Sequence, residues 1–188
     1  MNDLTINDRQ KLLMKTLIGL QAVEIVWDIN AFYFNTQLAS FKLECLEAVP
    51  LGSNYAYDEI FYCDFSECNT RIRFENGDKN FWYKIISSDC VIHKIDFISV
   101  IELFPENKVI PIESANNHEQ GLNKSTLGLI LQTNKGFVPA FLLPSNHGFT
   151  WQPKFDFYSK DEVDQLLVDN IMYYEVMSLT GEKGVTNV

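Results

Sequence analysis

The stretch from residue 81 to residue 103, FWYKIISSDCVIHKIDFISVIEL, constrains the fold more than any other part of the sequence. It is the longest dense block of β-branched and aromatic residues in the chain, and such residues favour pleated strands. Ser87, Ser88 and Asp89 interrupt the block, which therefore predicts two strands or one long bent strand. We expect this block to lie in the middle of an antiparallel sheet.

Two turn signals predict hairpins on either side of the block. Asn76-Gly77 follows the alternating segment 70–75 and precedes the block, and Asn-Gly between two such segments is a strong hairpin signal. Downstream, Asn134-Lys135-Gly136 separates the apolar segments 126–133 and 137–143. Short connections of this kind join neighbouring antiparallel strands, so both signals favour an antiparallel sheet.

Helical signals lie near the two ends of the sequence. The motif Thr5-x-x-Asp8 resembles a capping box, and the apolar spacing after it predicts a helix from about Ile6 to Ile18. The motif Ser159-x-x-Glu162 is a second capping box. Apolar residues then recur at helical spacing, which predicts a helix from Lys160 to about Met177.

Together these elements predict an α+β fold. It consists mostly of an antiparallel β-sheet of about seven to nine strands, flat or strongly curled, flanked by an N-terminal and a C-terminal helix. We expect the two helices to cover one face of that sheet. The chain has 188 residues, which suits one domain, and we assign residues 1–180 to a single globular domain and residues 181–188 to a frayed tail.

The charge of the chain restricts the classes of partner that it is expected to bind. The formal net charge is −10, divided evenly between the two halves of the sequence. Such a surface repels phosphate backbones and anionic lipids, so we predict no nucleic acid and no membrane partner. The N-terminus lacks the pattern of a secretory signal, and no apolar run approaches the roughly 18 residues that span a bilayer. These features predict a cytoplasmic protein.

Four side chains at paired spacing raise the question of a metal site: Cys63, Cys68, Cys90 and His93. Zinc takes four such ligands, but the segments around them read as apolar strands rather than metal-binding turns. Free cysteines are commonly buried, so we interpret these as reduced core residues and predict no metal and no cofactor. No nucleophile elbow and no phosphate-binding glycine loop is present. These features favour a protein without catalytic activity, and catalysis stays an open alternative.

A cluster of acids supplies the candidate partner-binding residues: Asp58, Glu59, Asp64 and Glu67. A solvated strand face explains them most simply, and a docking patch for a basic protein is the sharper interpretation. Our leading hypothesis is a non-enzymatic protein-binding module of a bacterial-type cytosolic protein. Immunity-type inhibitors of toxins are an analogy at the level of class, because an acidic face suits a cationic nuclease site.

Two alternatives remain open. The first is a small-molecule-binding protein or enzyme with an aromatic pocket near His147 and Trp151. The second is a structural or oligomer-forming subunit that pairs through an exposed edge strand at 137–143, where Pro139 predicts an edge position. The sequence predicts no particular oligomeric state.

Overall fold

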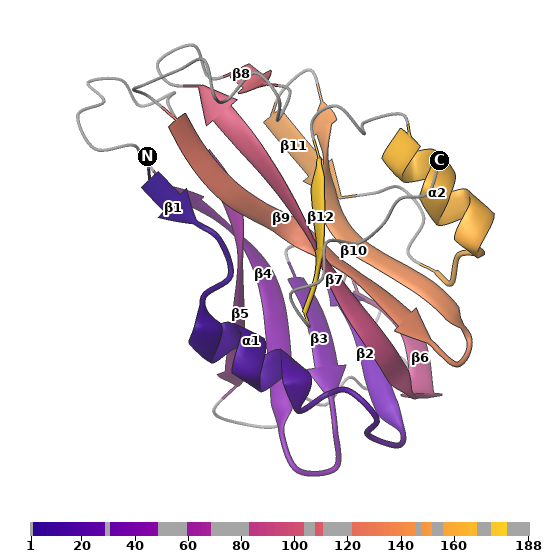
Figure 1. The fold of residues 1–188 in the computed structure, drawn as a ribbon. Helices are drawn as coiled ribbons and strands as arrows, with labels where there is room; N and C mark the ends of the chain where they lie inside the picture. The colour runs from indigo at the N-terminus through magenta and orange to yellow at the C-terminus, as the bar shows by residue number, and fades with distance from the viewer. Residues whose placement is uncertain are drawn as a thin grey trace.

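A computed structural model shows a mostly β fold in the α+β class, with two helices among the residues that it describes (Figure 1). None of the helices in the part of the chain that the structure describes is long and apolar enough to cross a membrane. The structure describes residues 2–28, 31–48, 60–68, 83–103, 108–110, 122–145, 148–151, 156–168 and 174–179.

The strands form two sheets, which we call the small sheet and the large sheet. The small sheet has five antiparallel strands in the order β5-β4-β3-β2-β6. Its strands are β2 (Val23–Asp28), β3 (Ala31–Asn35), β4 (Ser40–Ala48), β5 (Ile60–Cys68) and β6 (Tyr83–Cys90).

The large sheet has seven strands, and its main path is β11-β10-β9-β7-β12. Off this path, β1 pairs with β9 in parallel and β8 pairs with β7. The strands are β1 (Asn2–Leu4), β7 (Ile92–Leu103), β8 (Lys108–Ile110), β9 (Leu122–Thr133), β10 (Gly136–Ser145), β11 (Gly148–Trp151) and β12 (Glu175–Ser178). The prediction of a single sheet with seven to nine strands is therefore wrong.

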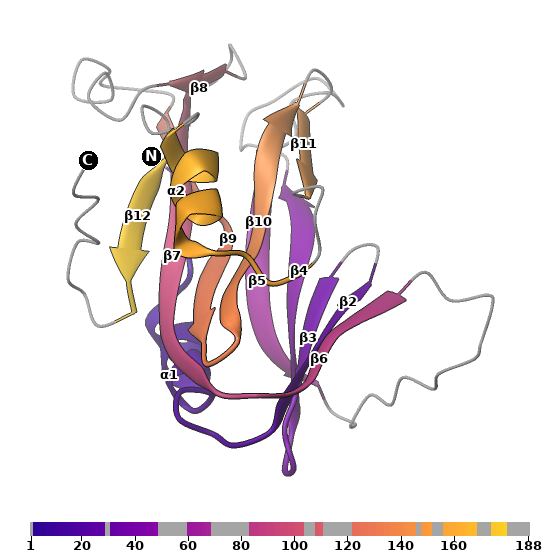
Figure 2. The ribbon, with the colours of Figure 1, turned by 90° about the vertical axis from the view of Figure 1, so that its right-hand side faces the viewer.

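The central sequence block joins the two sheets. It forms β6 at an edge of the small sheet and β7 inside the large sheet, and Figure 2 shows the two strands joining the layers at one end. The crossing lies at Val91. Asn134, in the β9–β10 turn, donates its backbone N–H to the Val91 carbonyl (3.0 Å), and its Oδ1 accepts the Val91 N–H (2.9 Å). The block is thus two strands, as one reading of the sequence predicted, but they belong to different sheets.

One hydrophobic core fills the space between the sheets. In the small sheet, the Phe65 ring stacks on Phe41 with ring centroids 5.8 Å apart, and it lies 6.0 Å from Phe34. Ile95 of β7 and Leu131 of β9 are fully buried in the same cluster. Burial of large apolar side chains from both sheets holds the two layers together.

The first helix, α1 (Asp8–Lys15), begins two residues later than predicted. Its N-cap is Asn7, and the capping box pairs Asn7 with Gln10 rather than Thr5 with Asp8. The Thr5 hydroxyl and backbone N–H instead donate to Asp3. The helix contacts β5, and the buried side chain of Met14 joins the core between the sheets.

The second helix, α2 (Lys160–Val168), has the predicted start, where Ser159 and Glu162 form both hydrogen bonds of the capping box. The predicted end at Met177 is wrong, because Glu175–Ser178 forms β12 and pairs with β7. This helix contacts β10 in the large sheet, whereas α1 contacts β5 in the small sheet. The two helices therefore do not cover one face of one sheet.

The hairpin predictions have different outcomes. The downstream hairpin is confirmed as β9 and β10, with Thr133 opposite Gly136. Asn76-Gly77 and the segment before it lie outside the described residues, and β6 pairs with β2.

The predicted edge at 137–143 is bonded on its outward side near both ends. Phe137 exchanges two hydrogen bonds with Tyr158, and β11 pairs with β10 from Leu142 onward. Pro139 lies between these contacts. Its missing N–H falls on the outward side, like the N–H of Phe137, because backbone directions alternate along a strand. The proline therefore leaves the pairing with β9 intact.

Candidate functional site

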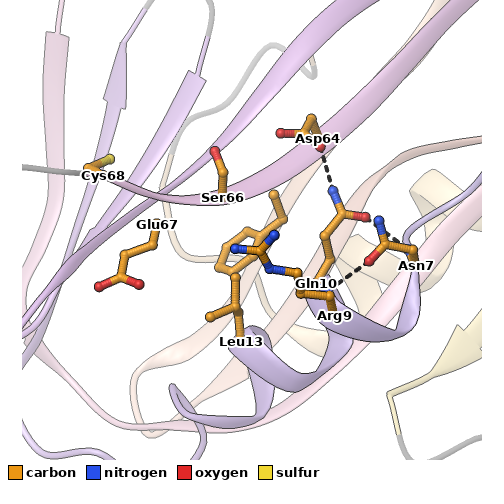
Figure 3. A pocket seen from close by; sticks show the side chains of 9 residues that line it. Asn7, Arg9, Gln10, Leu13, Asp64, Ser66, Glu67 and Cys68 are labelled. Carbon is orange, nitrogen blue, oxygen red and sulfur yellow. Dashed lines mark hydrogen bonds between the residues drawn. The ribbon is translucent and has the colours of Figure 1, made fainter.

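A groove of about 580 Å³ runs between α1 and β5. Among the described strands, β5 is an edge strand of the small sheet. Figure 3 shows the helix and the strand side by side, with Asn7 and Asp64 at one end and Leu13 and Cys68 at the other. The groove is lined by Asn7, Arg9, Gln10, Leu13, Asp64, Phe65, Ser66, Glu67 and Cys68.

Gln10 fastens the start of the helix to the strand. Its Oε1 accepts the backbone N–H of Asn7 at 2.8 Å, which closes the capping box. Its Nε2 donates to Asp64 on β5 (Figure 3). One side chain therefore satisfies a helix terminus and positions the helix against the strand. The Asp64 carboxylate is already engaged by this contact.

Two charged side chains of the groove have no such engagement. Arg9 on α1 and Glu67 on β5 are exposed. Neither forms a hydrogen bond or an ion pair within the described residues, and they do not pair with each other. The groove thus offers a guanidinium and a carboxylate that remain available to a ligand.

The outward face of the small sheet continues from the groove and is rich in acids. The register places Asp28, Ala31, Glu44 and Asp64 in one row across strands β2 to β5. Glu44 and Asp64 are directly opposite on neighbouring strands, an arrangement of like charges that destabilises a sheet. Glu24 shares the face two rows further along, opposite Asn35 and beyond the row of Val26 and Tyr33.

Lys42 is the one lysine or arginine that the described parts of β2 to β5 turn to this face. Its Nζ lies 2.7 Å from Glu44 Oε2, and this hydrogen bond raises the pKa of Lys42. Tyr33 lies opposite Lys42, and burial followed by the charge of Asp28 raises the pKa of the Tyr33 hydroxyl. The face therefore carries a net negative charge.

The structure places half of the predicted partner-binding residues. Asp64 and Glu67 line the groove, and Asp64 also belongs to the acidic row. Asp58 and Glu59 lie outside the described residues. The predicted pocket residue His147 also lies outside them. Trp151 ends β11, but its side chain is not among those described.

Several residues of the site were missed by sequence reasoning. The alternating patterns of β2 and β4 contain the signal for Asp28 and Glu44, because residues two apart share a face. Arg9 and Gln10 carried no such signal, since their proximity to β5 depends on how the chain folds back across more than fifty residues.

The four side chains with metal-ligand spacing do not meet. Cys63 and Cys68 lie on β5 and Cys90 on β6, at opposite edges of the small sheet. Cys63 and Cys90 are buried, which confirms their interpretation as core residues. Burial raises the pKa of Cys63 well above its usual range and that of Cys90 to about 11, so neither favours the thiolate.

Comparison with protein-family models, curated proteins and solved structures gives no significant match. The groove and the acidic face are therefore the features from which a function can be inferred.

Proposed function

We propose that the protein is a non-enzymatic protein-binding module whose acidic face docks a basic surface of a partner. The observation that carries this proposal is the row of Asp28, Glu44 and Asp64 across the small sheet, with Glu44 directly opposite Asp64. Such a row costs stability in the isolated protein. A cationic partner would relieve that cost on binding and would be attracted over a distance by the same charges.

A cationic nuclease is the narrower form of this proposal. The site of such an enzyme must attract phosphates, so its surface is positive and complements an acidic sheet face. The net charge of −10 adds a long-range attraction for the same partner. In that form the protein acts as an immunity-like inhibitor.

The groove gives less support to a small-molecule function. Its volume of about 580 Å³ falls within the usual range for small ligands. Such pockets are lined mainly by apolar and aromatic side chains, however, whereas six of the nine residues that line this groove are Asn7, Arg9, Gln10, Asp64, Ser66 and Glu67. A polar groove beside an acidic face favours a protein partner.

The test compares two triple variants with the same change in net charge. Asp28→Asn/Glu44→Gln/Asp64→Asn neutralises the acidic row, and the control Asp89→Asn/Asp161→Asn/Asp164→Asn neutralises acids elsewhere. A partner is first captured from an extract of the source cells by the wild-type protein. Its affinity for each purified variant is then measured by calorimetry at several salt concentrations.

We expect the row variant to bind about tenfold more weakly. Three solvent-facing charge pairs at roughly 0.5 kcal/mol each sum to about 1.5 kcal/mol, which corresponds to that factor. The control variant should bind like the wild type, and the salt dependence should be smaller for the row variant. Equal affinity of the row variant and the wild type, or the failure to capture any stable partner, would contradict the proposal.

A further inference from the structure

The groove has binding groups that the acidic face lacks. It combines the edge of β5 with two opposite charges, on Arg9 and Glu67, that form no ion pair within the described residues. We propose that it binds an extended peptide segment, which adds as a strand to β5 and carries one acidic and one basic side chain. The acidic side chain binds Arg9 and the basic side chain binds Glu67. The two charges that select the segment, Arg9 and Glu67, lie outside the acidic row, so this inference does not depend on the function proposed for that row.

Within the described residues, the backbone of β5 is paired with another strand on one side only. On one side it pairs with β4 without interruption, from Ile60 opposite Ala48 to Cys68 opposite Ser40. On its other side, no strand within the described residues pairs with it. An edge strand presents a row of backbone donors and acceptors, and peptide recognition by strand addition uses such a row.

The dimensions of the groove suit a short extended segment. The stretch Asp64–Cys68 lines it, and at about 3.3 Å per residue this stretch is roughly 16 Å long. The opposite wall is α1, whose eight residues rise about 12 Å at 1.5 Å each. Four or five extended residues therefore fill the length over which helix and strand run side by side (Figure 3).

The charges select the side chains of that segment. The planar guanidinium of Arg9 can donate two parallel hydrogen bonds to a carboxylate. The Glu67 carboxylate attracts a lysine or an arginine. Asp64 lies nearer the end of the groove at Asn7, where Gln10 donates to it, so Glu67 is the carboxylate at the end toward Cys68 (Figure 3). Half-buried Leu13 lines the same groove and gives an apolar contact for a residue between the two charges.

The positions of Arg9 and Glu67 in the groove also predict the direction of the ligand. Arg9 arises from the first turn of α1, near the end of the groove at Asn7, and Glu67 lies toward the end at Cys68 (Figure 3). The acidic side chain of the segment should therefore lie toward Asn7 and the basic one toward Cys68. Exchanging the two protein charges should reverse this order.

The experiment uses a display library of random ten-residue peptides, selected in parallel against three forms of the full chain. The forms are the wild type, the charge-exchanged variant Arg9→Glu/Glu67→Arg, and the control Lys160→Glu/Asp164→Lys. The control exchanges an exposed ion pair on α2, so all three forms have the same net charge. Circular dichroism and the midpoint of urea unfolding confirm that each variant is folded.

We expect the wild type and the control to enrich peptides with one acidic and one basic residue, separated by a few positions. The charge-exchanged variant should enrich peptides with the two charges in the opposite order. By fluorescence anisotropy, a wild-type peptide should bind the exchanged variant about tenfold or more weakly, and exchanging the charges in the peptide should restore its affinity. Among residues 64–68, the alternate backbone amides that point away from β4 should exchange hydrogen more slowly when the peptide is bound.

Three results would overturn the inference: no enrichment by the wild type, enrichment without a charge pattern, or equal affinity of the wild-type peptide for the exchanged variant. Slowed exchange that spares residues 64–68 would reject strand addition on β5. The variant Asp28→Asn/Glu44→Gln leaves the groove charges in place and should retain peptide binding. Failure in the groove therefore remains distinguishable from failure of the acidic face.

Discussion

The two sheets differ in what their outward faces carry. In the large sheet, β9 from Leu127 to Leu131 and β10 from Phe137 to Leu143 are apolar on both faces, and eleven of the twelve residues of β9 are buried or half-buried. Tyr174 packs edge-on against Phe141 at 6.0 Å, and α2 contacts β10. In the small sheet, β4 alternates between buried residues and polar ones such as Lys42 and Glu44.

This difference fits a scaffold role for the large sheet and the binding role that we propose for the small sheet. A strand that is apolar on both faces must be covered on both, and the chain covers the large sheet with its own C-terminal elements. Alternating strands need burial on one face alone, so the outward face of the small sheet can carry charges that suit a partner. Three predictions test this comparison.

The largest effect is expected where the large sheet is most tightly packed. Gly128 in β9 has φ +147, and a Cβ there would lie 2.2 Å from the Ala140 carbonyl oxygen and 2.4 Å from Phe141 Cα. Gly128→Ala should lower the free energy of unfolding by about 4 kcal/mol, the sum of backbone strain and overpacking. Urea unfolding measures the loss.

The control for that change is Gly19→Ala. Gly19 also has a positive φ, +80, but no atom lies within 4 Å of a Cβ built there. Its alanine variant should therefore lose only about 1 to 2 kcal/mol from the left-handed backbone. Similar losses for the two variants would show that close packing of β9 on β10 does not set the cost.

The second prediction concerns Glu102, a buried acid of the large sheet. Glu102 in β7 is 7% exposed, its Oε1 accepts no hydrogen bond from the described residues, and burial raises its pKa to about 7. The folded pKa lies above the unfolded value of 4.5, so the folded state holds the proton more tightly. The resulting stability is complete below pH 4.5 and is lost as the pH rises through about 7.

A shift of this size corresponds to about 3 kcal/mol. Glu102→Gln should remove that part of the decline in the free energy of unfolding between pH 4 and pH 8. Urea titrations at each pH measure the difference between variant and wild type, and exposed Glu67→Gln serves as the control that keeps the decline. Parallel pH profiles for the wild type and Glu102→Gln would contradict the assigned burial.

The smallest expected effect is an increase in the free energy of unfolding, and it concerns the small sheet. Asp64→Asn removes the charge opposite Glu44 and keeps an oxygen that can accept the hydrogen bond from Gln10. The variant should be about 0.5 kcal/mol more stable than the wild type, and the gain should shrink in high salt. The control Asp89→Asn removes an acid that pairs with Lys135 and should give no gain. A loss of stability in Asp64→Asn would show that its charge stabilises the isolated fold.

Local signals predicted local structure well. The capping box at Ser159 and Glu162 starts α2, and the turn at Asn134-Lys135 joins β9 to β10, because each depends on hydrogen bonds within a few residues. The predicted box at Thr5 and Asp8 was wrong, since Asn7 and Gln10 two positions on supply a stronger local alternative. The predicted end of α2 was also wrong, because Glu175–Ser178 pairs with β7, a strand far away in the sequence.

The sequence by itself determined the α+β class, the start of α2, one hairpin and the burial of Cys63 and Cys90, since these follow from hydrophobicity and short-range hydrogen bonding. The tertiary structure decided that residues 81–103 divide between two sheets. It also decided that Arg9 and Glu67 line one groove. The physical reason is that a strand's backbone groups accept any partner of suitable register. The choice of partner is made by burial across the whole chain, which no single stretch encodes.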